Sequence, residues 1–328
     1  MVIRLSPECT DLIERQSGVL ARWQASGRAS DLSGIDALLR RERWQALYRG
    51  VYAAHNGPLS RESVLWAAVR RCGPTAALSH FTAAELDRLA DRPSDAIHVT
   101  IPLLARTRFS ESEFCRGLPR VAVYRSSRID SGARHPARMP PRIRIEETVL
   151  DLVELAQDFD AAFSWLSAAC NRRLVMPDQI RSAAALRRKM RWRAEVLVAL
   201  REIGTGVCSS LERKYLLNVE RPHRLPQPER QARMELGARS AYLDNLYSEF
   251  AVAVELDGRA AHPAEARWQD VHRDNFFARS GLVTLRYNWA DVTERPCQVA
   301  AEVALTLRMR GWTGTLRSCG PRCQATGP

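Results

Sequence analysis

The chain has 328 residues, 45% of them hydrophobic, and a formal net charge of +12 at neutral pH. This length exceeds what one typical core accommodates, so two or three domains are expected in an ordinary folded composition. No apolar stretch approaches the roughly 20 residues that span a bilayer, and the first residues lack the apolar segment of a secretory signal, so we expect a cytoplasmic protein without membrane association.

The basic charge balance suits a polyanionic partner such as DNA, because cationic side chains that neutralise phosphates release condensed counterions. A second interpretation is compositional. Only Lys189 and Lys214 are lysines among the 49 basic residues, and such an arginine bias arises in a GC-rich genome without any functional cause. Charge alone does not decide between the two.

The first 58 residues predict a winged helix-turn-helix. Amphipathic segments at 8–18, 19–26 and 31–44 indicate three short helices, and residues 44–54 indicate a hairpin around Arg49 and Gly50. The third helix would enter the major groove of DNA, with Arg40, Arg41, Arg43 and the wing residue Arg49 toward phosphates or base edges. The alternative is a small bundle whose arginines form a solvated face, since eight arginines face six acids in this stretch.

Residues 59–200 predict a mixed α/β middle domain. Helices are expected at 61–72 and 79–89, strands at 95–102 and 120–127, and mostly helical structure from 145 to 200. Much of the excess charge lies here, and the run 187–193 concentrates it around Trp192. Arg188 and Arg191 in this run are candidate contacts to a nucleic-acid backbone. The other interpretation is the solvated face of a helix.

Residues 201–312 predict a mixed sheet flanked by helices. The expected order is a helix at 209–220, strands at 229–237, 240–247 and 250–258, a helix at 264–281 and a strand at 282–289. A buried strand followed by a helix and another apolar strand is typical of such a sheet.

Three acids lie along these strands. Alternation predicts that Asp244 lies near the same end of the sheet as Glu255 or Asp257. Crowded carboxylates repel one another unless a divalent cation neutralises them, and Mg²⁺ prefers oxygen ligands. The pattern predicts a magnesium site that polarises a phosphate and lowers the pKa of a bound water.

Two further residues are expected to assist at this site, His262 in proton transfer and Glu212 in positioning water. His262 follows Asp257 by five positions, and an imidazole titrates near neutrality, as a general acid or base requires. Glu212 on the preceding helix is placed to orient a metal-bound water. The alternative for His262 is an ordinary surface residue, and for the acids the charged edge of a strand.

The following residues carry a resemblance to a known family: Leu211-Glu212, Pro226-Gln227-Pro228, Asp244, Glu255-Leu256-Asp257-Gly258, His262, Asp270, Arg273-Asp274-Asn275, Gly281 and Leu285-Arg286. In this order, the span from about 209 to 296 resembles the domains related to very-short-patch-repair (Vsr-type) endonucleases, a branch of the PD-(D/E)XK nuclease fold. The resemblance implies that Asp244 binds the metal with Glu255 and Asp257 beside it, that His262 acts as acid and base, and that Glu212 assists.

A looser resemblance covers the first 160 residues: Trp44, Arg49-Gly50-Val51-Tyr52, Ser79-His80-Phe81-Thr82-Ala83-Ala84, His98-Val99-Thr100-Ile101-Pro102 and Thr148-Val149-Leu150-Asp151-Leu152. These residues are similar to the N-terminal part of antitoxins of the abortive-infection (AbiE, type IV toxin–antitoxin) group. That similarity implies a winged helix that binds operator DNA, and it makes a toxin or another protein a possible partner.

One departure from the nuclease pattern leaves two functions open. The superfamily usually has lysine two residues after the second acid, where this chain has Asp257; Vsr-type members also lack that lysine and use histidine. The first hypothesis is a DNA-binding, Mg²⁺-dependent endonuclease. The alternative is an antitoxin-like transcriptional regulator whose nuclease-fold domain is catalytically inactive.

The eight cysteines contain no CxxC pair, so no zinc ribbon or finger is expected. Cys319 and Cys323 lie in the segment 313–328, whose glycine, proline and small polar residues predict a disordered tail. Metal binding or a disulfide there is the less favoured interpretation.

Overall fold

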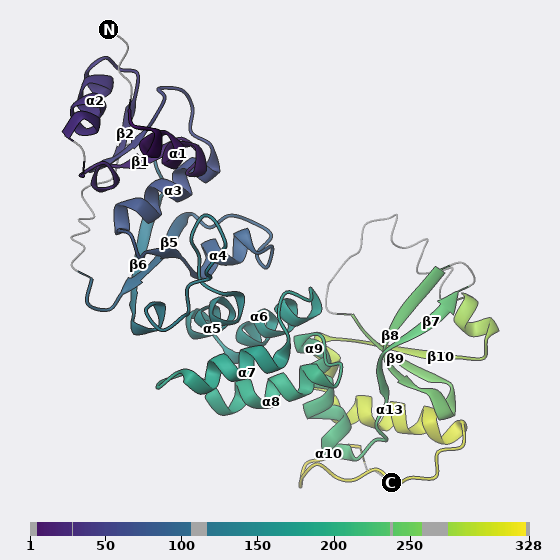
Figure 1. Cartoon of the computed structure of the whole chain (residues 1–328). Helices are drawn as coiled ribbons and strands as arrows, with labels where there is room; N and C mark the ends of the chain where they lie inside the picture. The colour runs from purple at the N-terminus through teal and green to yellow at the C-terminus, as the bar shows by residue number, and fades with distance from the viewer. Residues whose placement is uncertain (1–4, 28, 106–116, 237–238, 258–274, 326–328) are drawn as a thin grey trace. The chain divides into compact units, whose positions relative to one another are not determined.

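The computed structural model describes residues 5–27, 29–105, 117–236, 239–257 and 275–325. It divides the chain into two compact units. Unit 1 comprises Met1–Ala156 and Arg172–Arg191, and unit 2 comprises Gln157–Asn171 and Trp192–Pro328. Both units mix helices with small sheets, which confirms the predicted α+β class (Figure 1). Among the described helices, none has the length and apolar character needed to cross a bilayer.

Unit 1 begins with a small three-stranded sheet and its helices. The elements are α1 (Pro7–Arg15), β1 (Val19–Ala21), the 3-10 helix η1 (Arg22–Gln24), α2 (Ala29–Arg40), β2 (Gln45–Tyr48) and β3 (Val51–Ala53). The strand order is β1-β3-β2, and both pairings are antiparallel. The predicted hairpin is confirmed, and Gly50 at its tip has φ +73°, a conformation that costs glycine little.

The predicted helix at 19–26 is wrong. Val19, Leu20 and Ala21 form β1 instead and are fully buried, with Val19 opposite Ala53 in the sheet. A short apolar run fits either a helix or a buried strand, and here the pairing with β3 decides.

The core of unit 1 runs across residue 58, where a domain boundary was expected. The remaining elements are α3 (Arg61–Cys72), β4 (Ala77–Leu78), α4 (His80–Leu86), β5 (Ala96–Pro102), β6 (Arg120–Ser126), the 3-10 helix η3 (Ser127–Ile129), α5 (Ile145–Leu155) and α7 (Pro177–Leu186). One buried cluster joins Val51 of the first sheet, Trp66 of α3 and Val99 of the second sheet. The second sheet has the order β4-β5-β6, with β5 and β6 parallel.

Unit 2 is built on a four-stranded mixed sheet. Its elements are α6 (Phe159–Asn171), α8 (Arg193–Gly204), α9 (Ser210–Lys214), the π-helix η4 (Tyr215–Glu220), α10 (Arg221–His223), β7 (Glu229–Leu236), β8 (Arg239–Tyr247), the 3-10 helix η5 (Ser248–Phe250), β9 (Val252–Asp257), β10 (Val283–Asn288), α12 (Trp289–Glu294) and α13 (Pro296–Met309). The strand order is β10-β9-β8-β7. The pairings β7/β8 and β8/β9 are antiparallel, and β9/β10 is parallel.

Apolar residues cover both faces of this sheet. On one face, Val252 and Val254 of β9 pack with Tyr215 of η4 and Val303 of α13. On the other face, Ala253 packs with Phe277 and Leu282, among other residues. Alternation along β9 therefore buries a central strand on both sides, as predicted.

The tail predicted to be disordered lies instead against unit 2, over the part that the structure describes. Trp312, Leu316 and Cys323 pack on the core beside α13, and Ala325 is buried in it. The backbone N–H of Arg317 donates to the His223 carbonyl oxygen at 3.0 Å. Packing against α10 and α13 supplies the order that the local composition did not suggest.

Candidate functional site

Asp244 lies at the point where β8 separates from β9. The antiparallel register between the two strands covers Asn245 to Tyr247 and pairs Asn245 with Val254. Beyond it, the Asp244 carboxylate accepts a hydrogen bond from the Leu256 backbone N–H at 2.8 Å and one from the Gln231 side-chain amide at 3.2 Å. The carboxylate therefore reaches the β9 backbone between Glu255 and Asp257.

Glu255 and Asp257 project from one face of β9, because residues two apart on a strand share a face. Glu255 is buried, and Asp257 at the strand end is half-exposed. The parallel register pairs Glu255 with Arg286 of β10, whose guanidinium lies 3.7 Å from the Asp257 carboxylate. The Arg286 side chain thus lies next to the acidic end of β9 and pairs with Asp257.

Glu212 is held in place by the start of α9. Ser209 caps the helix by accepting the Glu212 backbone N–H, and the Glu212 carboxylate accepts the Cys208 backbone N–H at 2.9 Å. The side chain is buried. The pKa of Glu212 is raised to about 6, mainly by burial and also by the negative charge of Asp244, against the lowering effect of the Cys208 N–H.

The predicted acids gather in one region but do not converge on one point. Among the described residues, one group of three or more His, Cys, Asp or Glu has all its ligand atoms within 4.8 Å of one another. That group contains none of these acids. Joint binding of one ion by Asp244, Glu255 and Asp257 therefore requires their side chains to turn toward a common point. His262, together with Asp270, Arg273 and Asp274, lies outside the described residues.

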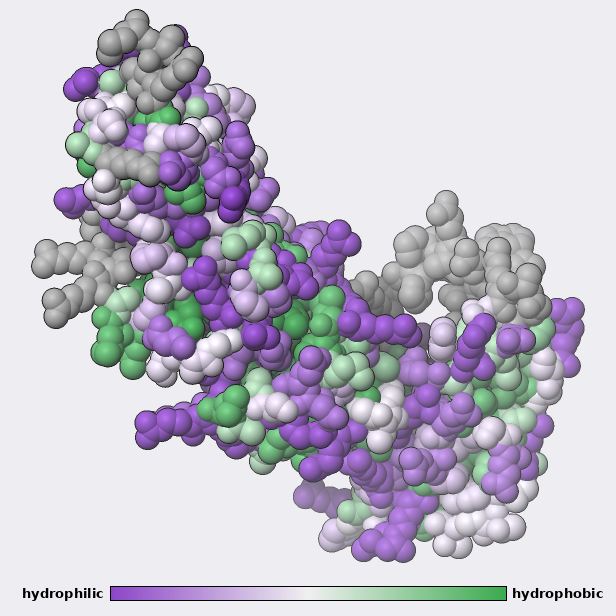
Figure 2. Space-filling view, in the orientation of Figure 1, coloured by the Kyte–Doolittle hydropathy of each residue, from purple (hydrophilic) through white to green (hydrophobic). Residues whose placement is uncertain are grey.

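The predicted DNA-contacting arginines of the N-terminal region are exposed. Arg40 is the last residue of α2, Arg41 and Arg43 lie in the following turn, and Arg49 is at the hairpin tip. The expected helix to residue 44 thus ends four residues early, so Arg41 and Arg43 are loop residues. Figure 2 shows mainly hydrophilic side chains on the viewed face of this region, with scattered hydrophobic patches.

The basic run 187–193 is not the solvated face of one helix. Residues 187–192 connect the end of α7 to α8, and Arg188 is exposed. Arg187 is instead buried, and its guanidinium contacts the carboxylates of Glu147 at 2.6 Å and Asp151 at 2.8 Å. The Arg191 guanidinium donates to the Ala156 carbonyl oxygen at 2.7 Å, a contact that holds it to the protein surface.

A cavity of about 500 Å³ adjoins this buried ion cluster in unit 1. Its lining includes His80, whose ring stacks on Tyr124 with centroids 3.7 Å apart. The pKa of His80 is lowered to about 3, mainly by burial and also by the charges of His98, Arg187 and Arg128. His80 therefore offers this basic cavity a neutral ring at physiological pH.

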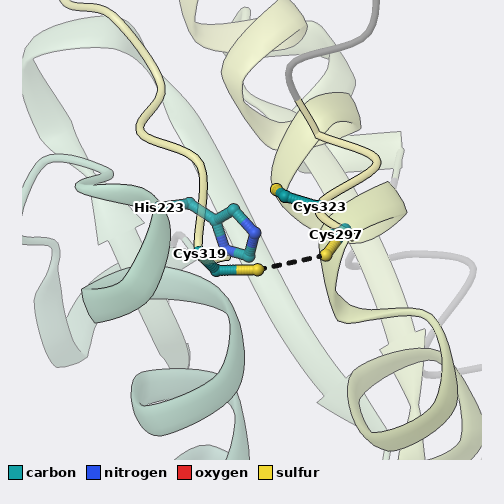
Figure 3. A group of neighbouring side chains, drawn as sticks. All are labelled: His223, Cys297, Cys319 and Cys323. Carbon is teal, nitrogen blue, oxygen red and sulfur yellow. Dashed lines mark hydrogen bonds between the residues drawn. The ribbon is translucent and has the colours of Figure 1, made fainter. Parts of the chain in front are cut away.

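Sequence reasoning missed a compact group of ligand atoms in unit 2: His223, Cys297, Cys319 and Cys323 (Figure 3). One ligand atom from each of these residues lies within 4.8 Å of all the others. The members come from α10, the first turn of α13 and the tail. The four residues therefore form no short sequence motif. The one local signal is the separation of Cys319 from Cys323 by three residues that include glycine and proline.

No known protein family and no curated protein matches the chain.

Proposed function

We propose that this chain is a DNA-binding protein whose unit 2 hydrolyses phosphodiesters in DNA with Mg²⁺. The observation that carries the proposal is the position of the Asp244 carboxylate, 2.8 Å from the Leu256 N–H and therefore between two acids of the neighbouring strand. Buried Glu212 adds a fourth carboxylate to this region, close enough for the charge of Asp244 to affect its pKa.

The topology of unit 2 supports the same proposal. Helix α9, the antiparallel strands β7, β8 and β9, and the parallel strand β10 follow the element order expected of a PD-(D/E)XK core of Vsr type. The resemblance implies that Asp244 binds the metal with Glu255 and Asp257 beside it. Asp244 lies on β8, and Glu255 and Asp257 lie on β9.

The donor set suits magnesium, because carboxylate oxygens are the ligands this ion prefers and water and phosphate oxygens complete its octahedron. Bound by Asp244, Glu255 and Asp257, the ion would polarise the phosphate and stabilise its developing negative charge. In the reaction, a water oxygen would bond to phosphorus, the P–O bond to the leaving sugar would break, a water proton would pass to a base, and the leaving oxygen would take up a proton to become a hydroxyl group. Glu212, with a pKa of about 6, is suited to exchange that proton.

Plasmid nicking in the presence of Mg²⁺ or Mn²⁺ tests this activity. We expect Asp244→Asn to reduce the rate about 100-fold or more, because loss of a metal ligand removes several kcal/mol of transition-state stabilisation. Glu249→Gln is the matched control, since Glu249 is an exposed acid in the 3-10 helix between β8 and β9. Equal nicking by Asp244→Asn and wild type, or none by wild type with either ion, contradicts the proposal.

A second candidate is an antitoxin-like regulator whose nuclease-type unit binds a partner protein without catalysis. The ion pair of Asp257 with Arg286 favours it, since Asp257 replaces the usual lysine and a metal would compete with the arginine for this carboxylate. The N-terminal order α1, β1, η1, α2, β2, β3 supports a winged helix with α2 as its recognition helix.

Both candidates require DNA binding by unit 1, which salt dependence tests. We expect replacement of Arg40, Arg41 and Arg43 by Ala to weaken binding to duplex DNA and to lower the slope of log K against log salt by about 0.9 for each phosphate contact removed. Arg15→Ala on α1, an exposed arginine paired with Asp11, is the control. An unchanged slope in the triple variant would show that this surface does not contact phosphates.

A further inference from the structure

The compact group of metal-ligand side chains in the described structure contains none of the predicted carboxylates. His223 ends the helical segment formed by α9, η4 and α10, and Cys297 is the second residue of α13. Cys319 and Cys323 belong to the tail that packs over these helices. The four residues thus join three segments that are far apart in sequence (Figure 3).

His223 presents a nitrogen suited to a metal. The residue is fully buried, and its Nδ1 lies 2.8 Å from the Val219 carbonyl oxygen. A carbonyl only accepts, so Nδ1 carries the proton and the lone pair of the neutral ring is on Nε2. Nε2 is buried and has no hydrogen-bond partner among the described residues. A carbonyl that fixes the ring in this way is a common feature of metal-binding histidines.

The sulfur spacing matches a tetrahedral metal site. The Sγ atoms of Cys297 and Cys319 are 3.5 Å apart. With Zn–S bonds of about 2.3 Å, tetrahedral geometry separates two sulfurs by about 3.8 Å, whereas a disulfide bond is about 2.05 Å long. The present spacing is therefore close to that of two thiolates on one ion and well beyond that of a covalent bond.

Local backbone structure brings the remaining thiols to the site. The Cys323 N–H donates to the Gly320 carbonyl oxygen at 3.0 Å, which closes a turn between the two tail cysteines. Cys297 lies in the first turn of α13, so the start of this helix holds its thiol beside the tail. The Arg317 N–H donates to the His223 carbonyl oxygen and fixes the tail beside the imidazole.

We infer that His223, Cys297, Cys319 and Cys323 form a structural zinc site that attaches the C-terminal tail to unit 2. Three thiolates and one imidazole fill a tetrahedron, and a closed four-ligand set of this kind stabilises a fold without leaving a position for substrate. Thiolate and imidazole ligands select zinc over magnesium, so the inference is independent of the proposed nuclease activity.

Metal content of the full-length protein tests the site. After incubation with ZnCl₂ and gel filtration, we expect one zinc per chain in wild type, and a loss of at least about nine tenths of it in Cys319→Ser and in Cys323→Ser, since these ligands are essential to a closed site. Cys170→Ser on α6 is the matched control, because this partly buried free thiol lies outside the group. Zinc-free wild type, or full zinc in the tail variants, would overturn the inference.

Two measurements on wild type alone keep the inference testable if a variant misfolds. Co²⁺ in place of zinc is expected to give the thiolate charge-transfer bands and strong visible absorption of a tetrahedral site, and octahedral Co²⁺ spectra would count against it. Thiol titration of the denatured, chelated protein without reductant is expected to find all eight cysteines. Six thiols would indicate a disulfide instead and overturn the metal site.

Discussion

Unit 2 contains two groups of potential metal ligands that differ in how closely they are assembled. The carboxylate group, Glu212, Asp244, Glu255 and Asp257, comes from one helix and two neighbouring strands, and its oxygens are spread. The thiol–imidazole group, His223, Cys297, Cys319 and Cys323, comes from distant segments, yet all its ligand atoms lie within 4.8 Å of one another. The group whose residues are farther apart in sequence therefore has the ligand atoms that lie closer together.

The difference fits the chemistry proposed for each group. A structural zinc site is closed by four protein ligands, so its geometry must be complete in the protein itself. Magnesium usually takes only one or two protein carboxylates and obtains its other ligands from water and from the phosphates of its substrate. A looser carboxylate group that completes its geometry on binding DNA is consistent with this second pattern.

Removal of bound metal by a chelator is expected to give the largest difference between the two groups. We expect a chelator to lower the free energy of unfolding of unit 2 by several kcal/mol in wild type, about 4 kcal/mol if free zinc stands 1,000-fold above its dissociation constant. Urea unfolding followed by tryptophan fluorescence measures the change. Added Zn²⁺ is expected to restore stability, and added Mg²⁺ is not, because thiolates and imidazole discriminate against it.

Two variants separate the groups in this experiment. Cys319→Ser is expected to unfold with the same midpoint with and without chelator, since its zinc site is already lost. Asp244→Asn is expected to respond to the chelator as wild type does. If Asp244→Asn abolished the response and Cys319→Ser kept it, the stabilising metal would belong to the carboxylate group and the comparison would fail.

The four strands of unit 2 were predictable because each strand carries its own signal. The apolar run that became β9 and the alternating runs that became β7 and β8 lie within a residue or two of their observed positions. In unit 1, the three-residue strand β1 was mistaken for a helix because so short a segment is determined by its partner β3. Local pattern thus predicted the four strands of unit 2, but it missed the short strand β1 and also the 14-residue helix α13.

Part of the candidate site was predictable because its acids lie on strands with a regular alternation of side chains. Asp244, Glu255 and Asp257 follow from strand alternation, but the separation of β8 from β9 at Asp244 is set by side-chain contacts to Gln231 and Leu256. The zinc ligands were missed because His223 lies 74 residues before Cys297 in sequence and only packing of the tail brings them together. Composition suggested a disordered tail, and hydrophobic contacts of Trp312 and Leu316 supply what composition does not show.

The ionisation of Glu212 is expected to have a smaller effect on the free energy of unfolding. This effect tests whether the buried negative charge of Glu212 destabilises the folded protein. Its pKa rises from 4.5 in the unfolded chain to about 6 in the folded protein. Between these values the folded state binds more protons than the unfolded state, so the free energy of unfolding falls as pH rises. The full cost, about 2 kcal/mol for a shift of this size, is present above pH 6 and is relieved below pH 4.5.

Glu212→Gln is expected to remove this cost, because a neutral amide keeps the shape of the side chain without the buried charge. Metal-free wild type and variant should differ most at pH 7 to 8, where the variant is more stable, and should converge toward pH 4.5. Urea unfolding across this range measures the difference, with Glu249→Gln as the exposed control. Parallel curves for wild type and Glu212→Gln would mean that the charge of Glu212 is balanced in the folded protein. The carboxylate group would then resemble the thiol–imidazole group in being structurally satisfied, and the electrostatic reason for placing a cation among these acids would be lost.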